Sequence, residues 1–250
     1  MQIAKRLQAG AFAAALVSGV VAAGSAHAVF LEFYGTNPVP TIGTPTGDPL
    51  TQRNAFLGNL SGGVGTEDFE GIPFGTNSPI GLSFPGSSGG ITATLTGSGS
   101  TILDDGGSSS AGRWATSGSQ YLQTSGGVDF TISFSSAISA FGFYGTDIGD
   151  IGADLVLTLS NSLTMTSQQV TLDTSAFGNG NLLFYGFIDT TNTWTDIAFD
   201  NTGSGDVFGF DDMTIGDIGQ VQIMPEASTL GLLGLGLLGL GLTARRRKAC

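Results

Sequence analysis

The chain has 250 residues, of which 40% are hydrophobic and 11% charged, and its formal net charge at pH 7 is −12. Without its two ends, residues 29–224 keep only two basic residues, Arg53 and Arg113, against 19 acidic ones, a formal charge of −17, and they contain no His, Cys or Lys. This composition argues against nucleic acid as a partner, because that binding depends on Lys and Arg, and it excludes disulfides, Ser-His-Asp triads, Cys-His pairs and Ser-Lys catalysis.

The first 28 residues have the form of a secretory signal. A basic start at Lys5 and Arg6 precedes an uncharged, Ala- and Val-rich run, Leu7–Gly24. The small residues of Ser25–Ala28 (SAHA) then offer the positions that a signal peptidase reads. A retained membrane anchor is the alternative, but the run is rich in Ala and Gly rather than Leu and Ile. We therefore expect signal peptidase to cleave after Ala28.

Residues 29–66 predict a loop-rich N-terminal segment with one short helix. Phe30–Tyr34 is a candidate strand, and a loop rich in Pro, Gly and Thr follows it. Asp48 suits an N-cap and Pro49 suits the first helical turn. Leu50–Leu57 is therefore predicted to be a helix, stopped by the glycine that comes next.

From residue 67 to residue 223 the pattern is that of a β-sandwich domain. Short segments with alternating apolar residues are separated by Gly/Ser/Asn/Asp turns about every 8–12 residues, which is typical of a sandwich. The candidate strands are Asp129–Phe134, Ala140–Tyr144, Leu155–Leu159, Leu163–Leu172, Leu182–Ile188, Thr195–Phe199 and Val207–Ile215. The expected fold class is all-β, an antiparallel β-sandwich of the jelly-roll type. The alternative, a β-solenoid, would need a fixed period of roughly 20–50 residues, which the chain lacks.

Acidic residues at both ends of this domain predict a structural calcium site. Calcium takes six to eight oxygen ligands, which carboxylates and carbonyls supply without His or Cys. Glu70, Asp211 and Asp212 are the candidate ligands. The two phenylalanines before Asp211 share one face, whereas Met213 and Ile215 fall on the other, which predicts a β-bulge that re-aims an acid. The alternative is a set of acids that face solvent at strand ends.

Aromatic residues in Gly/Ser/Thr-rich surroundings predict a carbohydrate site. An aromatic platform contacts the C–H faces of a sugar, and nearby polar groups bind its hydroxyls. The candidate residues are Arg113, Trp114, Tyr121, Tyr144 and Trp194. The alternative is that both tryptophans fill the core, as large aromatic residues usually do.

Catalysis is not expected of this domain. Without His, Lys and Cys, the remaining chemistry is that of carboxylate pairs, as in glycoside hydrolases. The 19 acidic residues supply many such pairs and single out none of them. A carboxylate-pair glycoside hydrolase and a purely structural matrix protein without a specific ligand remain as alternatives to a carbohydrate-binding role.

The C-terminus carries a second targeting signal. Ala227–Ala244 is an uncharged run of 18 residues with eight leucines, and as a helix it would reach about 27 Å, enough for a bilayer core. Arg245, Arg246 and Arg247 follow directly. Such a basic cluster stays on the cytoplasmic side. The run therefore predicts one transmembrane helix that leaves the preceding domain outside.

The sequence of Met224–Ser228 (MPEAS), followed by the Leu/Gly run and the basic end, resembles the PEP-CTERM sorting signal over residues 224–250. The resemblance implies that exosortase, a transpeptidase-like membrane protease, cleaves near Pro225 and Glu226. The product would pass from an inner-membrane-anchored precursor to the cell surface or an exopolysaccharide matrix. Ala227 stands where that family has a second proline. A plain C-terminal tail anchor is the alternative.

The segments DFEG at the start of the domain and FDDMTIG near its end are similar to those of carbohydrate-binding jelly-roll modules. In such modules the first and last strands lie side by side, and an acid from each helps to hold a structural calcium. The resemblance implies an exported, non-catalytic protein that associates with exopolysaccharide or another cell-surface carbohydrate.

Overall fold

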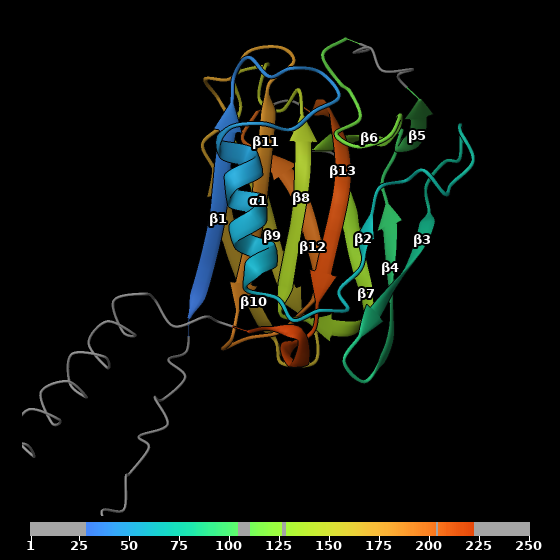
Figure 1. Ribbon diagram of the computed structural model, residues 1–250, viewed down its shortest axis with the longest axis vertical. Coiled ribbons are helices and arrows are strands. Elements are labelled where there is room, and N and C mark those ends of the chain that lie inside the picture. The colour runs from blue at the N-terminus through green and yellow to red at the C-terminus, as the bar shows by residue number, and fades with distance from the viewer. Residues whose placement is uncertain (1–28, 105–110, 127–128, 204, 223–250) are drawn as a thin grey trace, which may run out of the picture.

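The computed structural model describes residues 29–104, 111–126, 129–203 and 205–222, and Figure 1 shows two packed β-sheets with one helix on the outer side of one of them. In chain order the elements are β1 (Phe30–Asn37), α1 (Asp48–Gly58), β2 (Thr66–Glu67), β3 (Ile80–Gly86), β4 (Gly89–Thr96), β5 (Thr101–Asp104), β6 (Gln120–Gly126), β7 (Thr131–Ile138), β8 (Ala140–Thr146), β9 (Leu155–Asn161), β10 (Thr166–Leu172), β11 (Leu182–Asp189), β12 (Trp194–Asn201), β13 (Asp206–Gly216) and the 3₁₀ turn η1 (Ile218–Gln220). The expected all-β sandwich is confirmed, and the solenoid alternative is wrong.

Two of the predicted segments cannot be compared with this fold. The secretory signal and the transmembrane helix over 227–244 both lie outside the described residues. Within the part of the chain that the structure describes, no helix is both long enough and apolar enough to span a bilayer.

The strands form two antiparallel sheets. Sheet I has the order β1-β11-β8-β13-β6-β5, with β2 added beside β13, and sheet II has the order β10-β9-β12-β7-β4-β3. From β7 to β13 the chain changes sheet at every connection except the β9–β10 hairpin. Such crossings between two packed sheets are typical of a jelly roll.

The core between the two sheets is rich in phenylalanine. Phe143 and Phe210, on neighbouring strands of sheet I, stack with their ring centroids 4.8 Å apart. Phe199 of sheet II meets Phe143 edge-on at 5.6 Å and lies 4.8 Å from Phe130. Because side chains alternate between the two faces of a strand, these rings come from every second residue of the apolar segments.

Helix α1 is held on the outer face of sheet I by Phe56, which is fully buried. Gly142 of β8 and Gly186 of β11 lie opposite each other beneath its ring, and a Cβ on either would come within 2.9 or 3.1 Å of a ring carbon. The two glycines therefore form the seat for Phe56. The predicted helix is confirmed, but its N-cap is Gly47 rather than Asp48, and no side chain caps it.

The N-terminal segment 29–66 is built into the sandwich. Its strand β1 pairs along its whole length with β11, and its helix covers sheet I. At the other end of the described chain, Leu60 forms a β-bridge with Val221, and the amide of Gln222 donates to the carbonyl of Asn59. β1 starts and η1 ends at the same end of the sandwich, the lower end in Figure 1, while the loop before α1 lies at the opposite end.

Candidate functional site

A β-bulge interrupts β13 in the middle of sheet I. The pairing with β8 shifts register between Asp211 and Thr214, and Asp212 takes a left-handed backbone conformation with φ 50°. Phe210 and Met213 both point into the same core, so the bulge restores the apolar face that simple alternation would lose. At this point β13 changes partner from β6 to β2. The bulge predicted from the broken alternation is confirmed.

The acids around the bulge hold down the loop that precedes β6. One oxygen of Asp211 accepts hydrogen bonds from the amide and hydroxyl of Thr116, at 2.7 and 2.8 Å, and from the amide of Ser117 at 3.2 Å. Asp212 accepts from the Ser117 hydroxyl at 2.7 Å. Glu70 accepts from two further amides, those of Ser119 and Gln120. The loop is thus clamped by carboxylates from both ends of the domain.

The expected calcium ligands Glu70, Asp211 and Asp212 accept hydrogen bonds from N–H and O–H donors of the loop in this structure. Calcium needs six to eight oxygens turned toward one point, so these carboxylates would have to exchange loop donors for the ion. No group of three His, Cys, Asp or Glu residues in the described part of the chain is placed to hold a metal ion. Calcium binding stays a prediction for solution measurements.

A pocket of about 440 Å³ opens beside the bulge on the outer face of sheet I. Its lining comes from six places in the chain: the loop before α1, α1 itself, β2 with the residue after it, the clamped loop, strand β8 and strand β13. In that order the residues are Pro45, Leu50, Arg53, Thr66, Asp68, Thr116, Ser117, Tyr144 and Asp212. Figure 1 shows α1 and β2 on either side of β8 and β13. We call this the bulge pocket.

The polar groups of the bulge pocket are only partly satisfied. A guanidinium nitrogen of Arg53 lies 3.5 Å from an oxygen of Asp212, and the guanidinium carbon lies 5.7 Å from the centre of the Tyr144 ring. The Tyr144 hydroxyl and the Arg53 Nε are buried and have no hydrogen-bond partner among the described residues. Unpartnered buried donors are costly, so a ligand that supplies partners would gain from them.

Burial sets the charge states in this pocket. It raises the pKa of the Tyr144 phenol, which therefore stays neutral at physiological pH. It also raises the pKa of Asp212, while the Ser117 hydroxyl and Arg53 act in the opposite direction and Asp68 adds to the rise. The pocket thus combines one guanidinium, two carboxyl groups, a phenol and hydroxyls, which is a set that exchanges hydrogen bonds in both directions.

Of the five residues predicted to bind a ligand, only Tyr144 lines this pocket. Trp114, Tyr121 and Trp194 are fully buried. Their rings fill the interior, as the core-filling alternative holds, and offer no platform to a ligand in solution. Sequence reasoning missed Arg53, although its rarity was a signal, since it is one of two arginines in the acidic domain.

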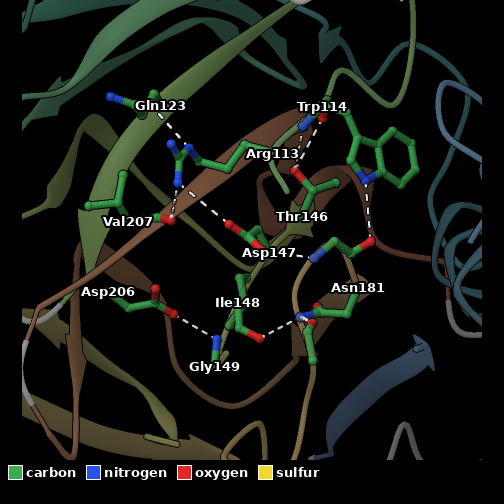
Figure 2. A network of polar contacts seen from close by, with 12 residues as sticks. Arg113, Trp114, Gln123, Thr146, Asp147, Ile148, Gly149, Asn181, Asp206 and Val207 are labelled. Atoms are coloured by element: carbon green, nitrogen blue, oxygen red, sulfur yellow. Dashed lines mark hydrogen bonds and ion pairs between the residues drawn. The ribbon is translucent and has the colours of Figure 1, made fainter. Parts of the chain in front are cut away.

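The remaining candidate, Arg113, belongs to a polar network that ties loops together (Figure 2). Its guanidinium donates to Gln123 at 3.1 Å and to the carbonyl of Val207 at 3.3 Å, and it lies 3.5 Å from Asp147. Asp147 also accepts from the Gly180 amide at 2.8 Å. Burial raises the pKa of Asp147 to about 6. Arg113 therefore joins the loop before β6 to β6, to β13 and to the residue after β8.

The C-terminal residues carry a sorting motif. The described chain ends at residue 222, and a family model matches the residues that follow it, 225–248. These residues are a PEP-CTERM protein-sorting motif. A PEP-CTERM motif implies an exported, membrane-anchored precursor that is processed by exosortase. The sorting residues Ala28, Pro225, Glu226, Ala227 and Arg245–Arg247 themselves lie outside the described residues.

Three solved structures resemble the domain. The K2 cleaved adhesin domain of Lys-gingipain is 16% identical, with a TM-score of 0.37, and the match covers 61% of this chain and 97% of that one. TmCBM61 in complex with β-1,4-galactotriose is 12% identical, with a TM-score of 0.27 and coverages of 59% and 97%. A DUF4465 family protein from Bacteroides ovatus is 11% identical, with a TM-score of 0.28 and coverages of 74% and 98%. A comparison with curated proteins gave no match. At these TM-scores the three structures carry no argument about ligands.

Proposed function

We propose that this exported PEP-CTERM protein binds uncharged carbohydrate in the bulge pocket and performs no catalysis. The observation that carries the proposal is a pair of buried groups that have no hydrogen-bond partner among the described residues, the Tyr144 hydroxyl and the Arg53 Nε, beside the carboxyl groups of Asp68 and Asp212. A sugar hydroxyl both donates and accepts, so it can satisfy a guanidinium, a phenol and a carboxylate in turn. Leu50 and Pro45 supply apolar surface for C–H groups.

The charge of the domain supports an uncharged ligand. Residues 29–224 carry a formal charge of −17, which repels anionic polymers at a distance. Inside the pocket, Arg53 already lies beside Asp212, so it is not a free cation for a uronic acid or a phosphate. Neutral hexose units fit this environment best.

The test is calorimetric titration of the exported protein with neutral oligosaccharides of glucose, galactose and mannose, with fragments of the strain's own exopolysaccharide, and with oligouronates. We expect binding to a neutral sugar and none to oligouronates. Arg53→Gln should weaken that binding at least tenfold, because a hydrogen bond from a charged group contributes about 1.5–3 kcal/mol. Tyr144→Phe should weaken it by a smaller factor.

Arg113→Gln is the matched control, since it removes the other arginine of the domain and should leave affinity unchanged. Failure of every sugar to bind, or full affinity in Arg53→Gln, would overturn the proposal. Binding lost only in Arg113→Gln would move the site to the network of Figure 2.

A carboxylate-pair hydrolase is the second candidate, because Asp68 and Asp212 line the same pocket. In this pocket Asp212 is already engaged by Arg53 and the Ser117 hydroxyl, which leaves it badly placed to exchange a proton with substrate. We expect no release of reducing ends from any polysaccharide that binds. Turnover that disappears in Asp212→Asn while the protein stays folded would favour the hydrolase instead.

A further inference from the structure

The outer face of sheet II is a surface made largely of hydroxyl-bearing side chains. Helix α1 packs on sheet I, on the other side of the molecule. Buried and outward residues alternate along β9, along β4 from Ile91, along β7 up to Ser135, along β12 from Ile197 and along β10 from Gln169, and the outward ones are exposed or half-buried. The outward residues are mostly serine and threonine, and we call this surface the hydroxyl face.

The strand register arranges the hydroxyl face in rows that run across the sheet. One row joins Thr94, Ser133, Asp196, Ser160 and Ser167, each opposite the next on the neighbouring strand. Since neighbouring strands lie about 4.8 Å apart, the row is about 19 Å long.

A second row runs parallel to the first, two residues further along each strand. It joins Thr96, Thr131, Ala198, Thr158 and Gln169. The distance between the rows is about 6.8 Å, twice the rise per residue of a strand. Within this row the Gln169 amide donates to the Thr158 hydroxyl at 3.3 Å, so these side chains point to the same side of the sheet.

The hydroxyl face is nearly free of charge on a strongly acidic molecule. Its strands place only two charged residues on it, Asp196 and Asp200. Asp196 is already bound by the hydroxyls of Ser133, at 2.7 Å, and Thr195, at 2.8 Å. By contrast, residues 29–224 contain 19 acids. A partner that binds this face therefore contacts hydrogen-bond donors and acceptors rather than a strong electrostatic field.

These properties select the kind of partner. A protein interface of ordinary composition needs a core of apolar or aromatic side chains, and the two rows contain one alanine and no larger apolar residue. Nucleic acid and other polyanions are repelled by the acidic domain. An uncharged polymer whose surface is itself covered with hydroxyls matches the face in both charge and hydrogen-bonding capacity.

We propose that the hydroxyl face binds an extended, uncharged polysaccharide chain that lies flat along the rows of Ser and Thr. This surface lies on a different sheet from the bulge pocket and shares with the proposed function only the chemical class of the ligand. The pocket recognises a short sugar unit, whereas the face holds the length of a polymer. Together they attach the protein to a matrix at two places.

The test is retention of the exported full-length protein on insoluble neutral glucans, cellulose and curdlan, with an alginate gel as the anionic comparison. We expect retention on a neutral glucan at 0.15 M and 1 M NaCl alike, and none on alginate. Thr94→Glu combined with Thr158→Glu adds one carboxylate to each row and should lower retention at least tenfold. Asn54→Glu combined with Ala55→Glu makes the same charge change on the exposed side of α1 and should leave retention unchanged.

Any one of three results would overturn the proposal. The first is passage of the wild-type protein through every neutral glucan. The second is retention of the Thr94/Thr158 glutamate variant equal to that of the wild type, and the third is release of the wild-type protein by high salt. If the glutamate pair melts below the assay temperature, Thr94→Ala with Thr158→Ala replaces it, with a smaller loss expected and equal retention counting against the face. Arg53→Gln separates the two sites, because it should weaken oligosaccharide binding at least tenfold and keep retention on the polymer. Retention without any oligosaccharide binding would refute the pocket and leave the face standing.

Discussion

Replacing Asp147 by asparagine should change how the stability of the domain depends on pH. Asp147 is 2% exposed, and its carboxyl group lies between the Gly180 amide and Arg113. Its backbone has φ 66°, a left-handed conformation that asparagine tolerates well. Asparagine also keeps an oxygen for the Gly180 amide. The substitution therefore removes a titrating group with little change in shape.

The sign follows from the raised pKa. Burial, the largest cause, lifts the pKa of Asp147 from 3.8 to about 6. Below about pH 4 the group binds a proton in both the folded and the unfolded chain. Between about pH 4 and 6 the unfolded chain releases that proton first, so the folded state loses stability as the pH rises, and above about pH 6 the whole loss is present. A difference of roughly two pKa units corresponds to about 3 kcal/mol, and water near the partly exposed Arg113 makes this the largest value expected.

Urea denaturation at pH 4.0 and pH 7.5 measures the effect. The free energy of unfolding of Asp147→Asn, relative to that of the wild type, should rise by about 2–3 kcal/mol between the two pH values. Asp211 and Asp212 also have a pKa raised by burial, but they titrate in both proteins and cancel in the comparison. Asp206 does not cancel completely, because its charge is one of the causes that raise the pKa of Asp147.

The control for this measurement is Asp129→Asn. Hydrogen bonds from Ser98 lower the pKa of the Asp129 carboxyl, so its contribution is present above its ordinary pKa and is lost as the pH falls. That variant should therefore lose stability relative to the wild type as the pH rises. The same pH dependence in the wild type and Asp147→Asn would refute the reasoning.

Three further predictions concern packing, processing and calcium. Phe56→Ala should lower the free energy of unfolding by about 3–5 kcal/mol, whereas Phe74→Ala, at a side chain 66% exposed, should change it little; equal losses would contradict the glycine seat. Pro225→Ala with Glu226→Ala should leave the precursor in the inner membrane, and mass spectrometry of the surface form that finds residues 230–242 intact would contradict exosortase processing. Calcium at ~100 times its dissociation constant should stabilise the protein by about 2.7 kcal/mol against chelator and not stabilise Glu70→Gln; unchanged wild-type melting would end the calcium prediction.

The bulge in β13 was predictable because the alternation of apolar and polar residues along the strand changes phase between Phe210 and Met213. Phe210 and Met213 both need the core, and only an inserted residue between them puts both on one face. The helix over residues 50–57 was predictable for a similar reason, since Asp48 and Pro49 mark its start locally. The strands β9 and β10 were also found, although β10 begins at Thr166 rather than at Leu163.

The parts that sequence reasoning missed depend on contacts between distant segments. Arg53 reaches Asp212 only because Phe56 seats α1 on two glycines that lie more than 80 residues further on. Trp114 stands in a Gly/Ser-rich stretch that has the composition of an exposed loop, and the carboxylate of Asp211 holds the adjoining Thr116 and Ser117 against sheet I. Strands β3 to β6 were not predicted, because their short alternation of apolar residues stands among many Gly, Ser and Thr residues.

The start of β1 and the end of η1 lie at the same end of the sandwich, the lower end in Figure 1. Gln222 is tied to Asn59 by a hydrogen bond, and the sorting motif begins three residues further on, at residue 225. A cut within the motif would therefore leave the Leu60–Val221 bridge and every described strand in place. The processed domain should keep the melting temperature of the precursor, because such a cut removes none of the described contacts that hold the two sheets together.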